Sequence, residues 1–240
     1  MKTINILRYI IIVSLIITLF SCNKTENSND EYNVIPEVII IKKKVNDTIK
    51  YALAYYAYAN QAIESAQVIT PNGDTPIELT SFKQALITFA NTPTESDFSI
   101  QEPVSGQYNF TVQNRNGEIF EDYDFLSNTY IEIPEITDIT FSPLNNTIDI
   151  KWTPTLSSES YFVRLLDLQG KTIYNGYEIH ADSTSYTMYP SDGGWILSPY
   201  SGSKYILQLN AVSYEDANMT EYYYHINAIS IAIEEIIWNP

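Results

Sequence analysis

Between residues 36 and 125 the chain alternates apolar and polar positions in short runs that are separated by residues favouring turns. A period of two is typical of strands that bury one face, and no amphipathic helical pattern is long enough to dominate a domain. The turns Pro71-Asn72-Gly73-Asp74 and Asn114-Arg115-Asn116-Gly117 place Asn and Gly where a positive φ costs little, which favours hairpins. The pattern predicts seven strands in this half, at 37–43, 48–58, 63–70, 76–79, 85–89, 107–113 and 118–125.

Residues 51–58 are ambiguous because their alanines also suit a helix. The tyrosines favour a strand, in which Tyr51, Leu53 and Tyr55 would share one face and Ala52 and Ala54 the other. Such a strand would be covered on one side, and in part on both sides. Residues 80–91 leave the same two alternatives open.

A second set of alternating runs begins just after Ile131-Glu132-Ile133-Pro134-Glu135, where a proline interrupts the pattern. The chain therefore predicts two all-β domains, 36–133 and 134–240, each an immunoglobulin-like β-sandwich. The junction has no Gly/Ser-rich spacer, so we expect the two domains to meet at a restricted angle. The second half is predicted to contain strands at 137–141, 147–152, 161–167, 172–177, 185–189, 204–213 and 222–233.

Three strands of the second half resemble those of fibronectin type III domains. The run from Ile148 to Trp152 points its apolar residues inward, as in the family's second strand with its buried tryptophan. The run from Tyr161 to Leu165 is similar to the third strand, and the one from Tyr205 to Val212 is similar to the family's Tyr-x-Val-x-Val-x-Ala strand. The resemblance implies a core that contains Trp152, Val163 and Leu207. It also implies a corner in which the Tyr205 hydroxyl bonds back to the backbone.

The first half repeats part of this pattern. Ser105-Gly106-Gln107-Tyr108 has the same glycine-then-tyrosine entry into an alternating strand as Gly202 to Leu209. We interpret the first half as a divergent relative or an immunoglobulin-like analogue of the second. The alternative, that any exposed hairpin partner shows this pattern, remains open.

The start of the chain has the layout of a secretory signal. Lys2 and Arg8 precede an apolar run from Tyr9 to Phe20, which is too short to span a bilayer comfortably. Leu19-Phe20-Ser21-Cys22 closes this run and resembles the lipobox of bacterial lipoproteins, although Phe20 departs from the usual small residue. The resemblance implies removal of residues 1–21 and acylation of Cys22 with palmitate-type chains. The alternative is a stray thiol after an ordinary signal peptide or an anchor helix.

Cys22 is the single cysteine of the chain, so no intramolecular disulfide is available and the cores must rely on packing. Residues 22–35 are mostly polar and predict a flexible linker that follows the lipid. Together these features predict a cell-envelope protein that is anchored by lipid to the outer membrane. Exposure on the cell surface is left open.

The chain is strongly acidic, with a formal net charge of −16 from 29 acidic and 13 basic residues. Removing residues 1–21 would take away two basic groups and no acidic one, which leaves a formal charge of −18. A protein that binds a polyanion needs a surface of positive potential, so this composition argues against nucleic acid as a partner. The one basic cluster, Lys42-Lys43-Lys44, is typical of a solvated strand end.

The pattern indicates no catalytic, cofactor or metal site, so we expect a non-enzymatic protein. His180 and His225 are the only histidines, and neither has a second histidine at the spacing of zinc ligands. No Gly-x-Ser-x-Gly turn is present for a serine nucleophile. The acidic clusters Glu121-Asp122-Tyr123-Asp124 and Glu215-Asp216 lack the order of a calcium loop and are interpreted as solvated charges.

One loop is rich in aromatic residues. Between residues 189 and 200, two glycines precede Trp195, with Tyr189 and Tyr200 at the two ends. Sugar rings stack on such side chains, so Tyr189, Trp195 and Tyr200 are candidate ligand-binding residues for a glycan. The alternative is that Trp195 closes the end of the sandwich core.

The leading expectation is a non-enzymatic lipoprotein that acts as a spacer, an adhesion module or a protein-binding module. The second expectation is a glycan-binding lipoprotein like those that accompany polysaccharide-uptake transporters. Its signal, lipobox, short linker and tandem β domains follow the same order as in those proteins. The expected partners are thus the membrane, through the lipid, and a protein or glycan ligand.

Overall fold

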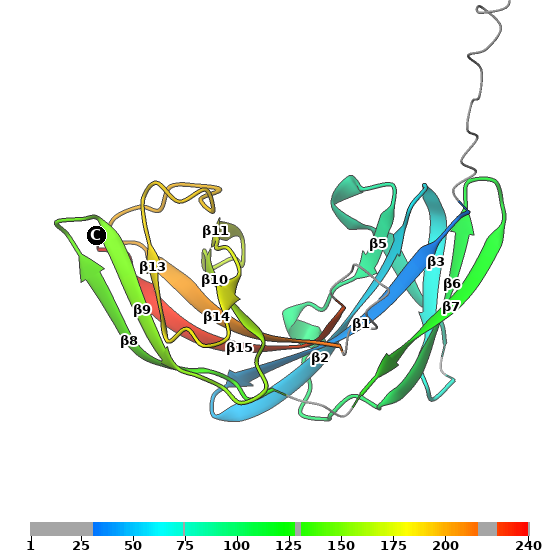
Figure 1. Ribbon diagram of the computed structural model, residues 1–240, viewed down its shortest axis with the longest axis horizontal. Coiled ribbons are helices and arrows are strands. Elements are labelled where there is room, and N and C mark those ends of the chain that lie inside the picture. The colour runs from blue at the N-terminus through cyan, green and yellow to red at the C-terminus, as the bar shows by residue number, and fades with distance from the viewer. Residues whose placement is uncertain (1–30, 74, 128–130, 216–224, 240) are drawn as a thin grey trace, which may run out of the picture. The chain divides into compact units, whose positions relative to one another are not determined.

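The computed structural model describes residues 31–73, 75–127, 131–215 and 225–239 (Figure 1). These residues form strands β1 to β15 and two short 3-10 helices, and no α-helix occurs among them. The all-β class predicted from the alternation is therefore confirmed for the described chain. The proposed signal peptide, Cys22 and most of the linker lie outside it.

The first half contains two layers of strands. Strands β1, β2 and β5 pair in that order, and β4, β3, β6 and β7 pair in that order. A short β4–β5 pairing connects the layers. The elements are β1 (Val34–Val45), β2 (Thr48–Ala59), β3 (Ile63–Ile69), β4 (Ile77–Ser81), η1 (Phe82–Gln84), β5 (Thr88–Asn91), η2 (Glu95–Asp97), β6 (Gly106–Asn114) and β7 (Ile119–Leu126).

Residues 51–58 are a strand, as the tyrosines predicted, because all of them lie within β2. The expected strand at 85–89 is wrong in its first part. Lys83 and Gln84 adopt positive φ angles of 50° and 65°, which end the extended backbone after β4. The strand β5 therefore begins only at Thr88.

The second half has the strand order of a fibronectin type III domain. A three-stranded sheet β13-β9-β8 faces the strands β11-β10-β14-β15. All seven strands expected here are present, and β12, which was not predicted, pairs with β10. The elements are β8 (Glu135–Ser142), β9 (Thr147–Thr153), β10 (Ser160–Leu166), β11 (Thr172–Asn175), β12 (Ile179–His180), β13 (Ser185–Met188), β14 (Lys204–Tyr214) and β15 (Ile226–Ile237).

The core of the second half contains the residues that the resemblance implied. Trp152 is 3% exposed, and Val163 and Leu207 are fully buried. The Trp152 indole packs on the Tyr161 ring, with the ring centroids 5.3 Å apart. The strand register predicted for β9, β10 and β14 is therefore confirmed.

A tyrosine corner is present in each half. In the second half the Tyr200 backbone N–H donates to the Tyr205 hydroxyl at 2.8 Å, across the longer approach to this strand. In the first half the buried Tyr108 hydroxyl donates to the Val104 carbonyl, also at 2.8 Å. The shared corner and the shared strand order support the interpretation that the first half is a divergent relative of the second.

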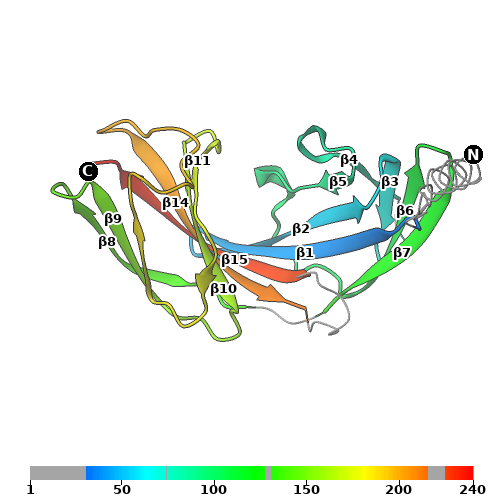
Figure 2. The ribbon, with the colours of Figure 1, turned by 45° about the horizontal axis from the view of Figure 1, so that its top comes forward.

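One strand pairing crosses from one half to the other. The first strand, β1, pairs in parallel with the last strand, β15, and Ile41 lies opposite Ile229 (Figures 1 and 2). Because β1 also pairs antiparallel with β2 along its whole length, the sheet continues from β11 to β7 without a break. The sequence pattern predicted only a short covalent junction between the halves and not this pairing.

Side-chain hydrogen bonds surround the crossing. The buried Ser230 hydroxyl donates to the Ile131 carbonyl at 2.7 Å, which ties the junction segment to β15. The backbone N–H of Ile226 donates to Glu37 Oε1 of β1 at 2.7 Å. The bond between Ile226 and Glu37 exists only while β1 and β15 stay paired, so separating the strands would remove a hydrogen bond from the buried Glu37 carboxylate.

We predict that Trp152→Ala destabilises the protein by about 3 to 5 kcal/mol, because truncating a buried aromatic side chain leaves a cavity between the two sheets. Leu144→Ala is the matched control, since Leu144 is 98% exposed and its loss should change stability by less than about 0.5 kcal/mol. Urea unfolding followed by fluorescence measures both variants. Equal stability of the two variants would contradict the assigned core.

We predict that cysteines placed at Ile41 and Ile229, in a Cys22→Ser background, form a disulfide without reshaping the fold. Paired strands lie about 4.8 Å apart, within the Cα separation that a disulfide spans. The control pair is Ile41→Cys with Ile233→Cys, which is displaced by four residues, or about 13 Å. Mass spectrometry under non-reducing conditions should detect the bond in the first pair alone. Equal oxidation of both pairs would disprove the register.

Candidate functional site

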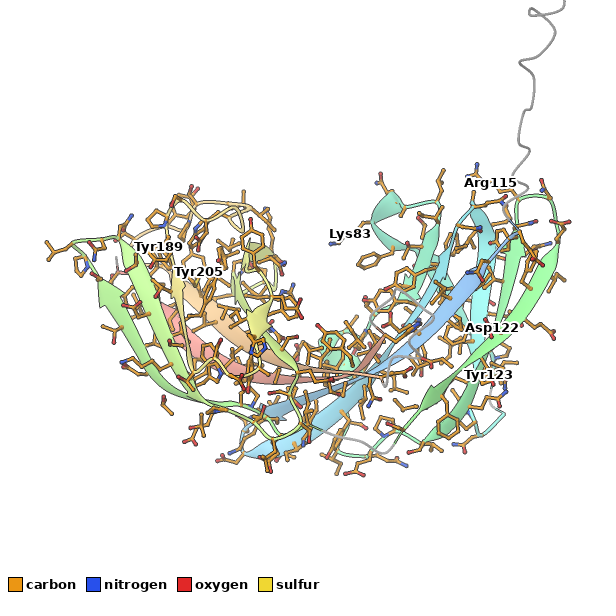
Figure 3. All side chains as sticks on the ribbon, viewed as in Figure 1. Lys83, Arg115, Asp122, Tyr123, Tyr189 and Tyr205 are labelled. Atoms are coloured by element: carbon orange, nitrogen blue, oxygen red, sulfur yellow. The ribbon has the colours of Figure 1, made fainter. Side chains whose placement is uncertain are left out.

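The aromatic loop predicted to bind a ligand connects β13 and β14. Tyr189 is 52% exposed and Tyr200 is 77% exposed, whereas Trp195 is only partly accessible. Figure 3 labels Tyr189 beside the strands of the second half. The three candidate residues thus differ in how much of each ring a ligand could reach.

Trp195 packs on its own protein. Its indole lies 4.7 Å from the Tyr174 ring and 5.4 Å from the Trp238 ring, measured between centroids. The indole N–H donates to the Tyr189 carbonyl at 2.7 Å. These contacts agree with the alternative in which Trp195 closes the end of the sandwich.

The two glycines before Trp195 let the loop approach β11 closely. A Cβ on Gly194 would lie 2.4 Å from the Asn175 carbonyl oxygen, and one on Gly193 would lie 2.4 Å from the Tyr177 hydroxyl. The Asn175 N–H donates to the Gly194 carbonyl at 2.9 Å. Glycine is therefore needed at position 194, where the contact is with backbone, whether or not a ligand binds; at position 193 the exposed Tyr177 side chain could move aside.

The hydroxyl of buried Tyr174 holds the 189–200 loop in place through Asp192. The Tyr174 hydroxyl donates to Asp192 Oδ2 at 3.0 Å and is 2.6 Å from the Tyr186 hydroxyl. The Tyr189 N–H donates to the same Asp192 oxygen at 2.9 Å. Burial, followed by the hydrogen bond with Tyr186, raises the pKa of Tyr174 far above its ordinary value, so the hydroxyl stays protonated and can donate.

A cavity of about 820 Å³ lies next to this loop. This volume is within the range of about 300 to 1,000 Å³ that small-molecule sites occupy. Tyr200 lines the cavity, together with Leu168 and Leu197 and the charged side chains Asp167, Lys171 and Lys204, but Tyr189 and Trp195 do not. The structure therefore brings one of the three candidates to a cavity.

A second cavity, of about 480 Å³, lies in the first half. Its lining includes Tyr51 and Tyr55 of β2 and the acidic residues Asp97 and Glu102. The Tyr51 hydroxyl donates to Glu102 Oε1 at 3.1 Å, so part of this lining is already engaged. The sequence analysis did not identify this site, because its residues come from three distant stretches of the chain.

Three carboxyl groups gather where β1, β7 and the end of β14 meet. Glu37 is 6% exposed, Asp124 and Glu215 are partly buried, and His225 acts electrostatically on all three. In the sequence Asp124 and Glu215 belong to separate acidic clusters, and their proximity was not predicted. Asp216 lies outside the described residues. No group of three or more His, Cys, Asp or Glu in the described chain is placed to hold a metal ion.

Burial is the main cause of the raised pKa of each of these carboxyl groups. It raises the pKa of Glu37 and of Asp124, and hydrogen bonds from the Ile226 and Val38 N–H groups oppose it. Burial, with the negative charges of Asp124 and Glu37, raises the pKa of Glu215 to about 7. Deprotonating the cluster therefore places like charges together beside the β1–β15 crossing.

Comparisons with known proteins do not identify a family. No protein-family model matches the chain, and no curated protein matches it. The described residues contain no helix with the length and hydropathy needed to cross a bilayer.

Several solved structures share a distant likeness. A DUF3823 family protein from Bacteroides uniformis is 13% identical, with 86% of this chain and all of that chain covered and a TM-score of 0.32. A two-domain fibronectin type III segment of chicken tenascin is 12% identical, with 84% and 98% covered and a TM-score of 0.28. The BSP domain of a biofilm-associated protein is 18% identical, with 86% and 29% covered and a TM-score of 0.25. The fold assignment rests on the strand order of this chain and not on these likenesses.

We predict that stability falls as the pH rises from about 4.5 to about 7, because the unfolded state releases the Glu215 proton in this window while the folded state keeps it. The folded pKa of Glu215 lies above its unfolded value of 4.5, so the folded state binds more protons in this window and its advantage is lost on deprotonation. In Glu215→Gln this part of the pH dependence should disappear. Urea unfolding of both proteins at several pH values measures the difference, and parallel profiles would show that Glu215 does not couple to folding.

Proposed function

We propose that this chain is a non-enzymatic, lipid-anchored protein of the bacterial cell envelope that acts as a spacer, an adhesion module or a protein-binding module. The β1–β15 pairing carries the structural part of the proposal. A spacer has to keep the two ends of its folded part at a fixed distance from each other. Strand pairing between the halves resists bending in a way that a flexible linker does not.

The anchoring part of the proposal rests on the sequence around Cys22. Leu19 and Ser21 match the lipobox, and the polar residues 23–33 supply a tether of up to about 36 Å when extended. Each methylene of an acyl chain contributes about 0.8 kcal/mol when it is buried in a membrane, and two chains hold a protein stably. The tether would thus keep the β-sandwiches beyond the lipid headgroups.

We predict that Cys22→Ser moves the protein from the membrane fraction to the soluble fraction, because the thiol that receives the lipid is lost. Fractionation of cells, followed by immunoblotting with and without detergent, measures the change. Ser21→Ala is the control, since it keeps both the thiol and a small residue before it. If Cys22→Ser still required detergent for extraction, the apolar run 9–20 or a protein partner would be the anchor.

Glycan binding is the second candidate, and the cavity at Tyr200 favours it. The exposed tyrosine supplies a flat ring for a sugar, and Lys171, Ser198 and Asp167 supply hydrogen-bonding groups around it. In this candidate Tyr189 and Trp195 have different roles. Tyr189 offers an exposed ring, whereas Trp195 supports the loop from its partly buried position.

A further inference from the structure

One edge of β2 has a gap in its strand pairing, and the cavity of about 480 Å³ in the first half lies at this gap. On this edge β5 pairs with β2 as far as Asn91, which lies opposite Tyr55. Pairing resumes at Tyr51, whose N–H donates to the Ser99 carbonyl at 2.7 Å and whose carbonyl accepts from the Ser99 N–H at 2.9 Å. Between these two pairs the chain turns away through the short helix η2. The segment of β2 centred on Leu53 is therefore left without a neighbouring strand on this edge.

The backbone of Leu53 directs its N–H and C=O groups toward the gap. Successive residues of a strand direct these groups to alternate sides, so Leu53 directs them to the same side as Tyr51, which bonds to Ser99. The residue in register with Leu53 would be Pro93, which has no N–H to donate. Within the described chain the Leu53 backbone makes no hydrogen bond on this side. The gap thus offers a ligand one donor and one acceptor of the kind that pairs strands.

The cavity is also lined by a buried tyrosine whose hydroxyl lacks a partner. Tyr55 is 6% exposed, and its ring packs on the Tyr108 ring with the centroids 6.0 Å apart. The Tyr55 hydroxyl makes no hydrogen bond among the described residues, yet its oxygen is not fully enclosed by protein. A ligand in the cavity that Tyr55 lines can therefore reach this group. Burial raises the pKa of Tyr55 above its ordinary value, so the hydroxyl stays protonated and can both donate and accept.

Two exposed carboxylates in the lining each keep one oxygen available. Asp97 Oδ2 accepts from the Thr94 N–H and from the Thr94 hydroxyl, both at 2.7 Å, and these bonds lower the pKa of Asp97. Glu102 Oε1 accepts from the Tyr51 hydroxyl at 3.1 Å. In the part of the chain that the structure describes, Asp97 Oδ1 and Glu102 Oε2 have no partner. Since the lining contains no Lys, Arg or His, a cationic ligand would complement its charge.

The same segment of the chain already binds one lysine. Lys43 of β1 donates to both carboxylate oxygens of Glu95, at 2.7 and 2.6 Å, and its Nζ lies 3.7 Å from the centroid of the Phe98 ring. Lys43 is the cross-strand neighbour of Lys50, so it lies on the face of the sheet away from Tyr51. This lysine therefore neutralises Glu95 and leaves the charge on the cavity side of the segment unpaired.

We propose that this cavity, defined by Tyr51, Leu53, Tyr55, Asp97 and Glu102 and here called the β2 gap site, binds an extended peptide segment that carries a lysine. The backbone of the peptide pairs with the N–H and C=O groups of Leu53, and a neighbouring polar group meets the Tyr55 hydroxyl. The lysine ammonium donates to the available oxygens of Asp97 and Glu102. The inference rests on the protein-binding part of the proposed function and adds a site and a partner class to it.

The length of the gap suits a short piece of extended chain. Tyr51 and Tyr55 are four positions apart in β2, which is about 13 Å along a strand and leaves room for about three peptide residues. A peptide supplies an N–H and a C=O at the spacing that Leu53 requires. A simple amine meets the two carboxylates but cannot pair with the strand edge, so the geometry favours a peptide.

The test titrates two pentapeptides into the full-length protein by isothermal titration calorimetry. Both have blocked ends and the sequence Thr-Val-X-Val-Thr, in which X is lysine or its uncharged analogue norleucine. We expect wild type to bind the lysine peptide about tenfold more tightly. Glu102→Gln and Asp97→Asn keep an oxygen for the bonds within the protein but remove the charge, so each should lower this preference at least about threefold. Thermal melts confirm that each variant is folded.

Two further measurements test the other groups of the site. Tyr55→Phe removes only the hydroxyl, so it should weaken both peptides to a similar degree and leave the preference for lysine unchanged. The Leu53 amide resonance in ¹⁵N–¹H spectra should shift with either peptide, because backbone pairing does not depend on the charge of the side chain. The matched control is Asp122→Asn, which removes an exposed carboxylate of β7 outside the cavity and should change neither affinity (Figure 3).

Equal affinity of wild type for the two peptides would overturn the proposal. So would an equal loss of the preference in Asp122→Asn and Glu102→Gln, because it would show that the net charge of the protein attracts lysine without a specific site. Binding of glucosamine that is lost in Glu102→Gln, with no binding of the lysine peptide, would show a site for an amino sugar and would also contradict the proposal.

The outcomes also separate this site from the function on which it rests. If both peptides bind and none of the variants at the β2 gap site weakens them, protein binding stands and this cavity is not its site. If neither peptide binds while Cys22→Ser releases the protein from the membrane, the β2 gap site fails and the anchored spacer stands. If the lysine peptide binds as expected while Cys22→Ser stays in the membrane fraction, the site stands and the lipid anchor fails.

Discussion

The parallel pairing of β1 with β15 is the contact on which the arrangement of the two halves depends. The strands lie almost two hundred positions apart in the chain, so the pairing closes a very long loop. The entropy of closure grows only slowly with loop length, and each sandwich already brings one of these strands to the surface. The pairing then adds backbone hydrogen bonds between surfaces that are largely ordered. The acidic cluster of Glu37, Asp124 and Glu215 lies beside this crossing.

The same pairing explains why charged groups are buried in an otherwise solvated protein. Glu37 is an interior residue of β1, and its carboxylate accepts from the first backbone N–H of β15. Asp124 plays the matching role for β1 itself, since its Oδ2 accepts from the Val38 N–H. Each carboxylate accepts a hydrogen bond from a backbone N–H near the crossing. This position also removes part of its contact with water. The raised pKa values of these groups therefore follow from the architecture.

Much of the fold could be predicted from local pattern, because a period of two and turn residues report directly on strands that bury one face. Trp152 and Tyr205 could also be assigned, since each belongs to a strand whose inward positions are fixed by alternation. The crossing could not be predicted in this way, because its partners are distant in sequence. One signal for it was present: Val38 to Ile41 is a continuous apolar run, which is typical of a strand covered on both faces. That run shows that a neighbour exists without saying which strand it is.

The candidate sites were harder to predict, because composition does not show which way a side chain faces or what already covers it. The glycines beside Trp195 suggested a displayed ring, yet the small size of Gly194 serves the contact of the loop with β11, and the indole packs on Tyr174. Arg164 shows the opposite case. In the sequence it is an ordinary polar position between inward-facing Val163 and Leu165, and no local pattern indicates that its Nε is buried without a hydrogen-bond partner among the described residues. A residue's chemistry can be read from the chain, but its lack of a partner is a property of the fold.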